Sequence, residues 1–261
     1  MIRHLLKHIQ RLIGKKLLDN TGIYIMNEWD GIFKREAQHD RFPMYKSIVG
    51  DTENKVVMDF GGNSGNLLHF SEGQIKEENF VCVDTDRNAL AFGKTEYPTA
   101  EWVHYNRYGW CYNQSGEKDG PFPEISKKID QIFSYSVLSH TDFTEIVETL
   151  RWMKSLNPET IAVSVLLTEN KLIADWFWRM RVQEYGSCID FRRELKECQS
   201  TFSVMDNNLI VTATPTLAKI DRRHLITFYD KDWLIAELAK EGFDVELVQP
   251  PLCYQTFIVI R

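Results

Sequence analysis

Short apolar runs separated by helix-like segments recur along much of the chain. The runs lie at residues 56–59, 80–84, 101–106, 129–138 and 160–167. The segments with helical spacing or helix-boundary residues lie at 64–71, 87–95 and 143–153. This alternation predicts an α/β fold with a parallel sheet. The last run, TIAVSVLL, is apolar almost throughout, which is expected of a strand covered on both faces.

Helix boundary signals support these assignments. Asp142 with Glu145 three residues later has the spacing of a capping box. Asp230 is a predicted N-cap for a helix over 231–240, and Gly242 follows it as a stop signal. The segments FDVELV and TFIVI then predict two final strands.

A glycine-rich turn follows the first apolar run, in the sequence KVVMDFGGNSGNLLHF. A strand that enters such a turn and then a helix places backbone N–H groups at the carboxyl edge of the sheet. The second run ends on Asp84, and a carboxylate there suits the hydroxyls of a ribose. The glycines match neither the G-x-G-x-x-G spacing of dinucleotide sites nor the Gly-Lys-Ser/Thr ending of a P-loop. The pattern predicts a nucleoside site of another kind.

Asp59, Gly61 and Gly65 resemble the first motif of class I S-adenosylmethionine-dependent methyltransferases, an acid followed by alternating glycines. Asn63 stands where that motif has its middle glycine, and Asn adopts a left-handed backbone more readily than most residues. The resemblance covers about residues 55–167 and resumes at about 224. It implies a Rossmann-like three-layer sandwich with a seven-stranded, mostly parallel sheet and an antiparallel last strand.

The resemblance also divides the chain into parts. Residues 51–169 and 224–261 would form the cofactor-binding core, and residues 1–50 a helical cover. Residues 170–223 would form an inserted lid after the fifth strand, for which a structural excursion or a dimerisation arm is the alternative. Within the lid, NLIVTATP could add a strand. The first 20 residues predict a basic amphipathic helix, which we expect to pack on the protein, with a membrane surface or a targeting role as alternatives.

The family's pattern implies roles for individual residues. Asp59 would contact the turn backbone or the amino group of the cofactor tail. Asp84 would bind the ribose hydroxyls, with capping of the helix from Arg87 as its alternative. Asn106, at the end of the third strand, would contact the adenine. The expected cofactor-binding residues are Asp59, Gly61, Gly62, Asn63, Gly65, Asp84, Thr85, Asp86, Asn106 and Ser136.

Methyl transfer from a sulfonium mainly requires alignment of the reacting atoms, so no fixed catalytic signature is expected. A general base is needed only where the acceptor must lose a proton. His140 follows the fourth strand, where the resembled family places residues beside the methyl group, and it is the candidate base. A structural role before a helix is its alternative. No metal site is expected, because the five cysteines are scattered without C-x-x-C spacing.

Composition limits the function further. The net charge of −6 provides no basic field for nucleic acid, which favours a small-molecule acceptor with an oxygen, nitrogen or carbon nucleophile. The cysteine pattern favours reduced thiols in the cytoplasm, and no apolar run is long enough for a transmembrane helix. The leading hypothesis is an S-adenosylmethionine-dependent methyltransferase, with a homodimer as a plausible assembly. A non-catalytic binding or assembly partner with the same fold is the alternative, and a nicotinamide oxidoreductase is the weakest one.

Overall fold

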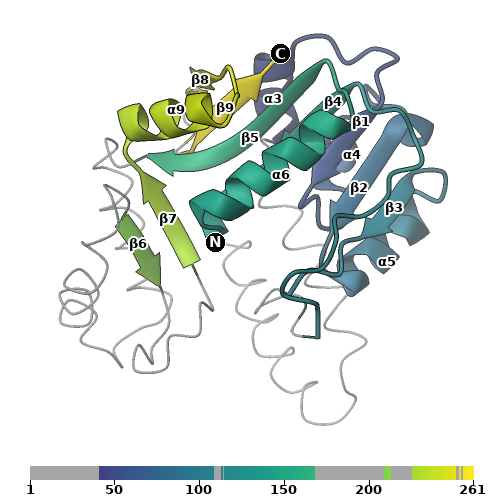
Figure 1. Ribbon diagram of the computed structural model, residues 1–261. Helices are drawn as coiled ribbons and strands as arrows, with labels where there is room; N and C mark the ends of the chain where they lie inside the picture. Colours follow the sequence, from purple (N-terminus) through teal and green to yellow (C-terminus); the bar gives the residue numbers. More distant parts are fainter. Residues whose placement is uncertain are drawn as a thin grey trace, which may run out of the picture.

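The computed structural model describes residues 41–108, 113, 115–167, 209–212, 225–250, 253 and 255–261 (Figure 1). The predicted amphipathic helix, almost all of the helical cover and most of the inserted lid lie outside these residues.

Five parallel strands form the centre of the sheet at the predicted positions. They are β1 (Val57–Phe60), β2 (Phe80–Asp84), β3 (Glu101–His104), β4 (Gln131–Ser134) and β5 (Thr160–Leu167). The two final strands are β8 (Glu246–Val248) and β9 (Thr256–Ile260), and β9 runs antiparallel to both β5 and β8. The order β3-β2-β1-β4-β5-β9-β8 confirms the predicted sheet with its antiparallel strand.

Two further strands bring the described sheet to nine. β6 (Leu209–Thr212) lies within the NLIVTATP segment, where an extra strand was expected. β7 (Leu225–Tyr229) was not predicted; it runs antiparallel to β6 and parallel to the end of β5. The pairing of β5 with β9 stops at Val165, so Leu166 and Leu167 project beyond it and pair with β7. Because β5 extends beyond its pairing with β4 and β9, its last two residues pair with β7 instead.

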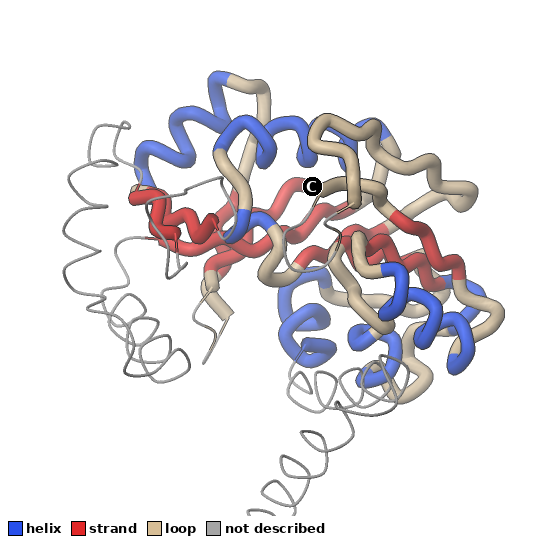
Figure 2. Tube along the Cα trace, turned by 90° about the horizontal axis from the view of Figure 1, so that it is seen from below, coloured by secondary structure: helices blue, strands red, loops and turns tan. Residues whose placement is uncertain are grey.

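Helices cover both faces of the sheet, which gives the predicted three layers (Figure 2). The buried residues of α3 (Arg41–Val49), α4 (Asn66–Phe70) and α5 (Arg87–Glu96) pack in one core cluster. Those of α6 (Phe143–Ser155) and α9 (Lys231–Lys240) pack in the other. The capping box at the start of α6 and the Asp230 cap of α9 are confirmed. Pro43 is the third residue of α3, near enough to the start of the described helix for a proline to be tolerated.

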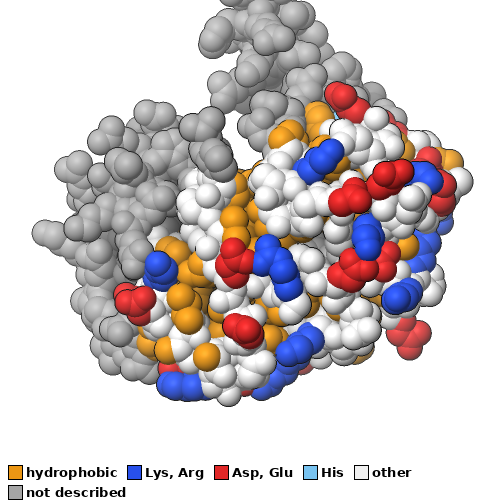
Figure 3. Space-filling view, turned by 90° about the horizontal axis from the view of Figure 1, so that it is seen from above, with side chains coloured by type: hydrophobic (Ala, Val, Ile, Leu, Met, Phe, Trp, Pro, Cys, Tyr) orange, Lys and Arg blue, Asp and Glu red, His pale blue; other side chains and the backbone are white. Residues whose placement is uncertain are grey.

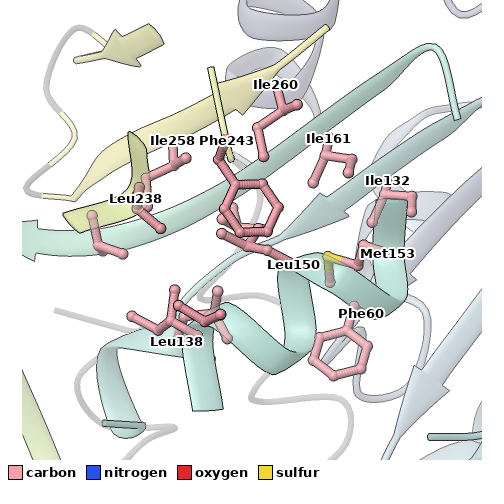
Figure 4. Packing of buried hydrophobic residues seen from close by; sticks show 14 of the residues in the cluster. Phe60, Ile132, Leu138, Leu150, Met153, Ile161, Leu238, Phe243, Ile258 and Ile260 are labelled. Atoms are coloured by element: carbon pink, nitrogen blue, oxygen red, sulfur yellow. The ribbon is translucent and has the colours of Figure 1, made fainter. Parts of the chain in front are cut away.

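Strand alternation decides which side chains meet each helix layer. Figure 4 shows Leu150 and Met153 of α6 packed beside Ile132 of β4 and Ile161 of β5. In β1, Met58 and Phe60 join this α6 cluster, whereas Val57 joins the α3–α4 cluster. Asp59 shares the phase of Val57, so the strand directs its carboxylate to the α3–α4 face.

The carboxyl ends of the parallel strands bring the predicted site segments to one edge. β4 was predicted to continue to Leu138, but it ends at Ser134, and a short 3₁₀ helix, η2 (Leu138–His140), follows. The order of the strands reverses between β1 and β4, and ligands of open α/β sheets bind at such a switch point. A second 3₁₀ turn, η1 (Glu77–Asn79), precedes β2 on the opposite edge.

The surface of the described part mixes both signs of charge. Figure 3 shows one face on which Lys and Arg side chains alternate with Asp and Glu side chains. Among the residues that the structure describes, no helix has the length and apolar character to cross a bilayer.

Candidate functional site

The glycine turn after β1 (residues 61–65) is pinned to its neighbours through the backbone. The Gly61 N–H donates to the Val83 carbonyl of β2 at 2.7 Å. Gly61 has a φ of 79°, and a β-carbon on it would lie 2.1 Å from Cγ2 of Val137. Only glycine meets both conditions, because other residues are strained at this φ and any side chain would overlap Val137. The turns after β1 and β4 therefore touch at the switch point.

Asn63 adopts the left-handed conformation that the sequence predicted, with a φ of 54°. Its N–H donates to Oδ2 of Asp84 at 2.7 Å. Gly65 is also left-handed, and its Cα faces the indole ring of Trp102, which a β-carbon would approach to 2.6 Å. The substitution of the family's middle glycine by Asn thus keeps both the turn and its contact with β2.

Asp84 presents its carboxylate to the turn with one backbone bond on each oxygen. Oδ2 accepts from Asn63, and Oδ1 accepts from the Asp86 N–H at 2.8 Å. Burial raises the pKa of Asp84, and these amide bonds oppose the rise. Since a carboxylate oxygen has two acceptor positions, each oxygen keeps one for a ligand hydroxyl.

The capping role considered for Asp84 belongs to Asp86. Oδ1 of Asp86 accepts from the N–H groups of Asn88 and Ala89 at 3.0 and 3.1 Å, and Asp86 is the N-cap of α5. A carboxylate that already holds two helix amides is less available to a cofactor than Asp84. Ligand binding by Asp86 stays a prediction.

Asp59 is fully buried, and neither of its carboxylate oxygens has a hydrogen-bond partner among the described residues. It lies under the turn, because a β-carbon on Gly62 would come within 2.8 Å of its Oδ2. Burial raises the pKa of Asp59 to about 7 and the charge of Asp84 adds to the rise, whereas the positive charge of Arg41 and the nearby Leu67 backbone N–H, which is outside hydrogen-bond geometry, lower it. An unpartnered buried carboxylate is costly in a ligand-free protein and suits a ligand with a positive donor.

Arg41 is the charged partner that the sequence analysis missed. Its side chain is 6% exposed, and its Nε and Nη1 have no hydrogen-bond partner among the described residues. The guanidinium carbon lies 5.3 Å from the ring centroid of Tyr135, which follows β4. Arg41, Tyr45 and Ile48 are buried at positions i, i+4 and i+7 of α3, so an arginine on an apolar helical stripe was the available signal.

Asn106 follows β3 at the same edge, but both ends of its amide already have partners. Its Nδ2 donates to Oε1 of Glu117 at 3.1 Å, and its Oδ1 accepts from Asn113 at 3.4 Å. An adenine contact by this side chain would have to compete with these bonds. The Thr85 carbonyl faces Nε2 of His104 at 3.2 Å, which ties β2 to β3 beside the site.

The β4 turn (residues 135–137) and η2 complete the described edge. Ser136 has a φ of 61°, an uncommon conformation for serine, and its N–H donates to Oγ of Ser164 at 2.7 Å. His140 ends η2 and is exposed. Its role as a general base stays a prediction. Among the described residues, no group of His, Cys, Asp and Glu side chains is arranged to hold a metal.

Residues 58–161 match a family model described as a methyltransferase domain. Among curated proteins, no sequence matches this chain. In solved structures, the chain is similar to DesVI of Streptomyces venezuelae, with 10% identity, a TM-score of 0.51 and coverage of 92% of this chain and 99% of that one. It is also similar to the PH0226 protein of Pyrococcus horikoshii OT3, with 11% identity, a TM-score of 0.51 and coverage of 87% and 90%.

A third similar structure is magnesium protoporphyrin IX methyltransferase from Synechocystis PCC 6803 with bound SAH. Its identity is 12%, its TM-score 0.45, and the alignment covers 95% of this chain and 92% of that one. At these identities the two structures with a TM-score of 0.51 show the fold, and the family model supplies the domain type. Residues 58–161 therefore match a methyltransferase domain, and the order of the strands is that of the predicted Rossmann-like fold.

Proposed function

We propose that the protein transfers the methyl group of S-adenosylmethionine to an oxygen, nitrogen or carbon atom of a small-molecule acceptor. The observation that carries this proposal is the arrangement of three charged side chains around the glycine turn: Asp84 with further acceptor positions, and Asp59 and Arg41 with polar atoms that make no hydrogen bond to the residues that the structure describes.

The charges of these residues fit the charges of the cofactor. Asp59 and Asp84 supply two negative charges when both are ionised, and Arg41 supplies one positive charge, which leaves the site one negative charge in excess. S-adenosylmethionine carries a positive sulfonium, a positive ammonium and one carboxylate, so it is positive by one charge. NAD places a negative pyrophosphate at this position of the fold, where it would face the buried Asp59. The site therefore favours the sulfonium cofactor.

In this proposal, each of the three residues binds a different group of the cofactor. Asp84 accepts hydrogen bonds from the ribose hydroxyls, and Asp59 accepts hydrogen bonds from the ammonium group of the cofactor. Arg41 donates hydrogen bonds to the cofactor carboxylate. An α-amino acid group would thus give partners to both buried side chains that lack them. When bound, the cofactor would supply a methyl group activated by the sulfonium, with the electron pair of the broken carbon–sulfur bond returning to sulfur as the acceptor takes the methyl.

The protein then contributes alignment and, where needed, removal of a proton. The β4 turn and η2 stand at the edge beside the glycine turn, so they are the described segments placed to flank the methyl group. His140 is the proposed base for acceptors that lose a proton. A small acceptor agrees with the net charge of −6 and with the alternating charges of Figure 3. A cytoplasmic location and a homodimer stay predictions.

Calorimetric titration with S-adenosylmethionine and with NAD tests the cofactor. We expect the wild-type protein to bind the first and not the second. Asp84→Ala should weaken binding by about tenfold to a hundredfold, because hydrogen bonds to a charged acceptor contribute about 1.5–3 kcal/mol each. Glu159→Gln is the matched control, since Glu159 is an exposed acid paired with Lys55 on the opposite edge.

Turnover separates an enzyme from a non-catalytic relative. Release of S-adenosylhomocysteine in the presence of a panel of small hydroxyl, amine and carbon acceptors would support methyl transfer. Binding of NAD in preference to S-adenosylmethionine, or binding of neither, would overturn the proposal. Cofactor binding without turnover on any acceptor would favour the non-catalytic alternative.

A further inference from the structure

Each residue of the β4 turn contacts a different part of the site. The Tyr135 ring lies under the guanidinium of Arg41 and stacks near Phe257 of β9, with centroids 6.2 Å apart. Val137 lies against Gly61 of the glycine turn. Between them, Ser136 is bonded through its backbone to the interior of the sheet. The conformation of Ser136 therefore sets the relative position of two site contacts.

A buried serine and a buried glutamine hold Ser136. Oγ of Ser164 in β5 accepts the Ser136 N–H at 2.7 Å and donates to Oε1 of Gln255 at 2.5 Å. Ser164 is 0% exposed and Gln255 is 1% exposed. Since a hydroxyl has one proton, its donation to Gln255 leaves its lone pairs for the amide of Ser136. These two hydrogen bonds, called the relay below, connect Gln255 just before β9 through Ser164 of β5 to Ser136 just after β4.

The relay holds Ser136 in a strained backbone conformation. Ser136 has a φ of 61°, in the left-handed region that costs a non-glycine residue about 1 kcal/mol or more. Such a conformation persists only where its surroundings hold it. Apart from Thr160 at its start, Ser164 is the single polar residue of the buried strand β5, where a hydroxyl is unfavourable unless it is hydrogen-bonded.

We propose that Ser164 and Gln255 are positioning residues for the methyltransferase site. They hold Ser136 in its left-handed conformation and so fix Tyr135 beneath Arg41 and Val137 against the glycine turn. Without the relay, Ser136 relaxes toward an ordinary right-handed or extended conformation, which rotates the adjoining peptides and displaces both contacts. The inference rests on the proposed function, because its effect is read through binding of S-adenosylmethionine.

The first experiment compares Ser164→Ala with Tyr45→Phe. Tyr45 donates a buried hydrogen bond of 2.5 Å to Oε1 of Gln131, the first residue of β4, so its variant removes a similar bond from the other end of the same strand. Both variants should lower the melting temperature. Only Ser164→Ala should weaken S-adenosylmethionine binding, by about tenfold, the scale of one buried hydrogen bond. Equal loss of affinity in both variants would overturn the proposal.

The second experiment tests the mechanism by rescue. Glycine adopts a positive φ without strain, so Ser136→Gly removes the need for a restraint. Loss of Ser164 should therefore weaken binding less in the Ser136→Gly background than in the wild-type background. A purely structural role of Ser164 predicts the same loss in both backgrounds, and that result would also overturn the proposal.

Two further measurements test the proposal even if Ser164→Ala does not fold. Gln255→Glu retains an acceptor oxygen for Ser164 and should keep affinity within about threefold of the wild type, whereas Gln255→Leu should not. Hydrogen exchange of the Ser136 amide in the wild-type protein should be slow before cofactor is added, and rapid exchange would contradict the relay. Failure of the wild-type protein to bind S-adenosylmethionine would instead refute the proposed function.

Discussion

Gly61 lies so close to Val137 that a β-carbon on the glycine would stand 2.1 Å from Cγ2 of the valine. The contact joins the turn after β1 to the turn after β4, at the place where the order of the strands reverses. Because the contact leaves no space for a side chain, it fixes how near the two walls of the candidate cofactor site approach each other.

Gly61→Ala should therefore impair both folding and cofactor binding. The substitution adds an overlap with Val137 to the strain of a φ of 79°, and overpacking alone costs about 1–3 kcal/mol. Thermal unfolding and calorimetric titration with S-adenosylmethionine measure the two effects. Gly50→Ala is the control, because Gly50 has a φ of 80° with nothing within 4 Å of a β-carbon. If both variants lose equal stability and neither loses affinity, the contact with Val137 has no role in the site.

Gly93→Ala should destabilise the protein although alanine is the better helix former. Gly93 lies in α5, and a β-carbon on it would come to 2.2 Å from Cη2 of Trp102. The indole cannot easily withdraw, because its Nε1 donates to the Tyr97 carbonyl at 3.0 Å. The gain of about 1 kcal/mol in helix propensity is then smaller than the overlap cost of about 1–3 kcal/mol.

Chemical denaturation of Gly93→Ala measures this balance. Gly93→Ala in a Trp102→Leu background should recover the propensity gain and become stabilising relative to Trp102→Leu alone. A stabilising effect of Gly93→Ala in the wild-type protein would show that Trp102 moves freely.

Local signals explain what the sequence revealed about this fold. The glycine turn, Asp84 at the end of β2, the capping box at Asp142 and the apolar β5 each depend on residues within one or two elements. Even the left-handed backbone of Asn63 followed from its place in the motif. Such features are predictable because chain geometry alone brings their residues together.

The features that were missed depend on contacts between distant segments. Arg41 acts on Asp59 only because α3 packs against the sheet, and Ser164 meets Gln255 only because β9 pairs with β5. β7 forms because the end of β5 is left unpaired by β9. No spacing rule along the chain reports these distances, so the sequence analysis did not identify Arg41, Ser164 or Gln255 as residues of the candidate site.

Arg41→Met should weaken S-adenosylmethionine binding, and it should raise the pKa of Asp59 further, because the positive charge that lowers this pKa is lost. The variant removes a buried guanidinium whose Nε and Nη1 are unpartnered, and a flexible apolar side chain of similar length can fill the space. We expect affinity to fall about tenfold or more, as expected for loss of a charge-assisted hydrogen bond.

Decarboxylated S-adenosylmethionine identifies the group that Arg41 binds. The wild-type protein should prefer the intact cofactor, and Arg41→Met should lose most of that preference because only the carboxylate is absent from the analogue. Arg41→Lys keeps the positive charge but lacks the forked donors of the guanidinium. Its preference for the intact cofactor should therefore be intermediate between that of the wild type and that of Arg41→Met. An unchanged preference in Arg41→Met would place the cofactor carboxylate elsewhere.

Cofactor affinity should rise with pH through about 7, with Asp59 as the titrating group. Burial raises the pKa of Asp59 to about 7 in the ligand-free protein, and ionised Asp59 is the form that accepts from a cofactor ammonium. S-adenosylmethionine should therefore bind more tightly at pH 8 than at pH 6, with protons released on binding near neutral pH. Titrations in buffers of different ionisation enthalpy measure that release, and Asp59→Asn should abolish most of it.

The stability of the ligand-free protein should respond to pH with the opposite sign. A folded-state pKa raised above the ordinary aspartate value of 3.8 means that the folded protein holds the Asp59 proton more tightly than the unfolded chain does. The contribution of Asp59 to the free energy of unfolding is therefore complete below pH 3.8 and is lost as the pH rises to about 7. Asp84, whose pKa burial also raises, acts in the same direction.

Chemical denaturation across this pH range measures the effect. The free energy of unfolding should decline less steeply with pH in Asp59→Asn than in the wild type, and equal slopes would mean that Asp59 is not protonated in the ligand-free site. Because cofactor binding favours the ionised form, saturating S-adenosylmethionine should increase stability more at pH 8 than at pH 6.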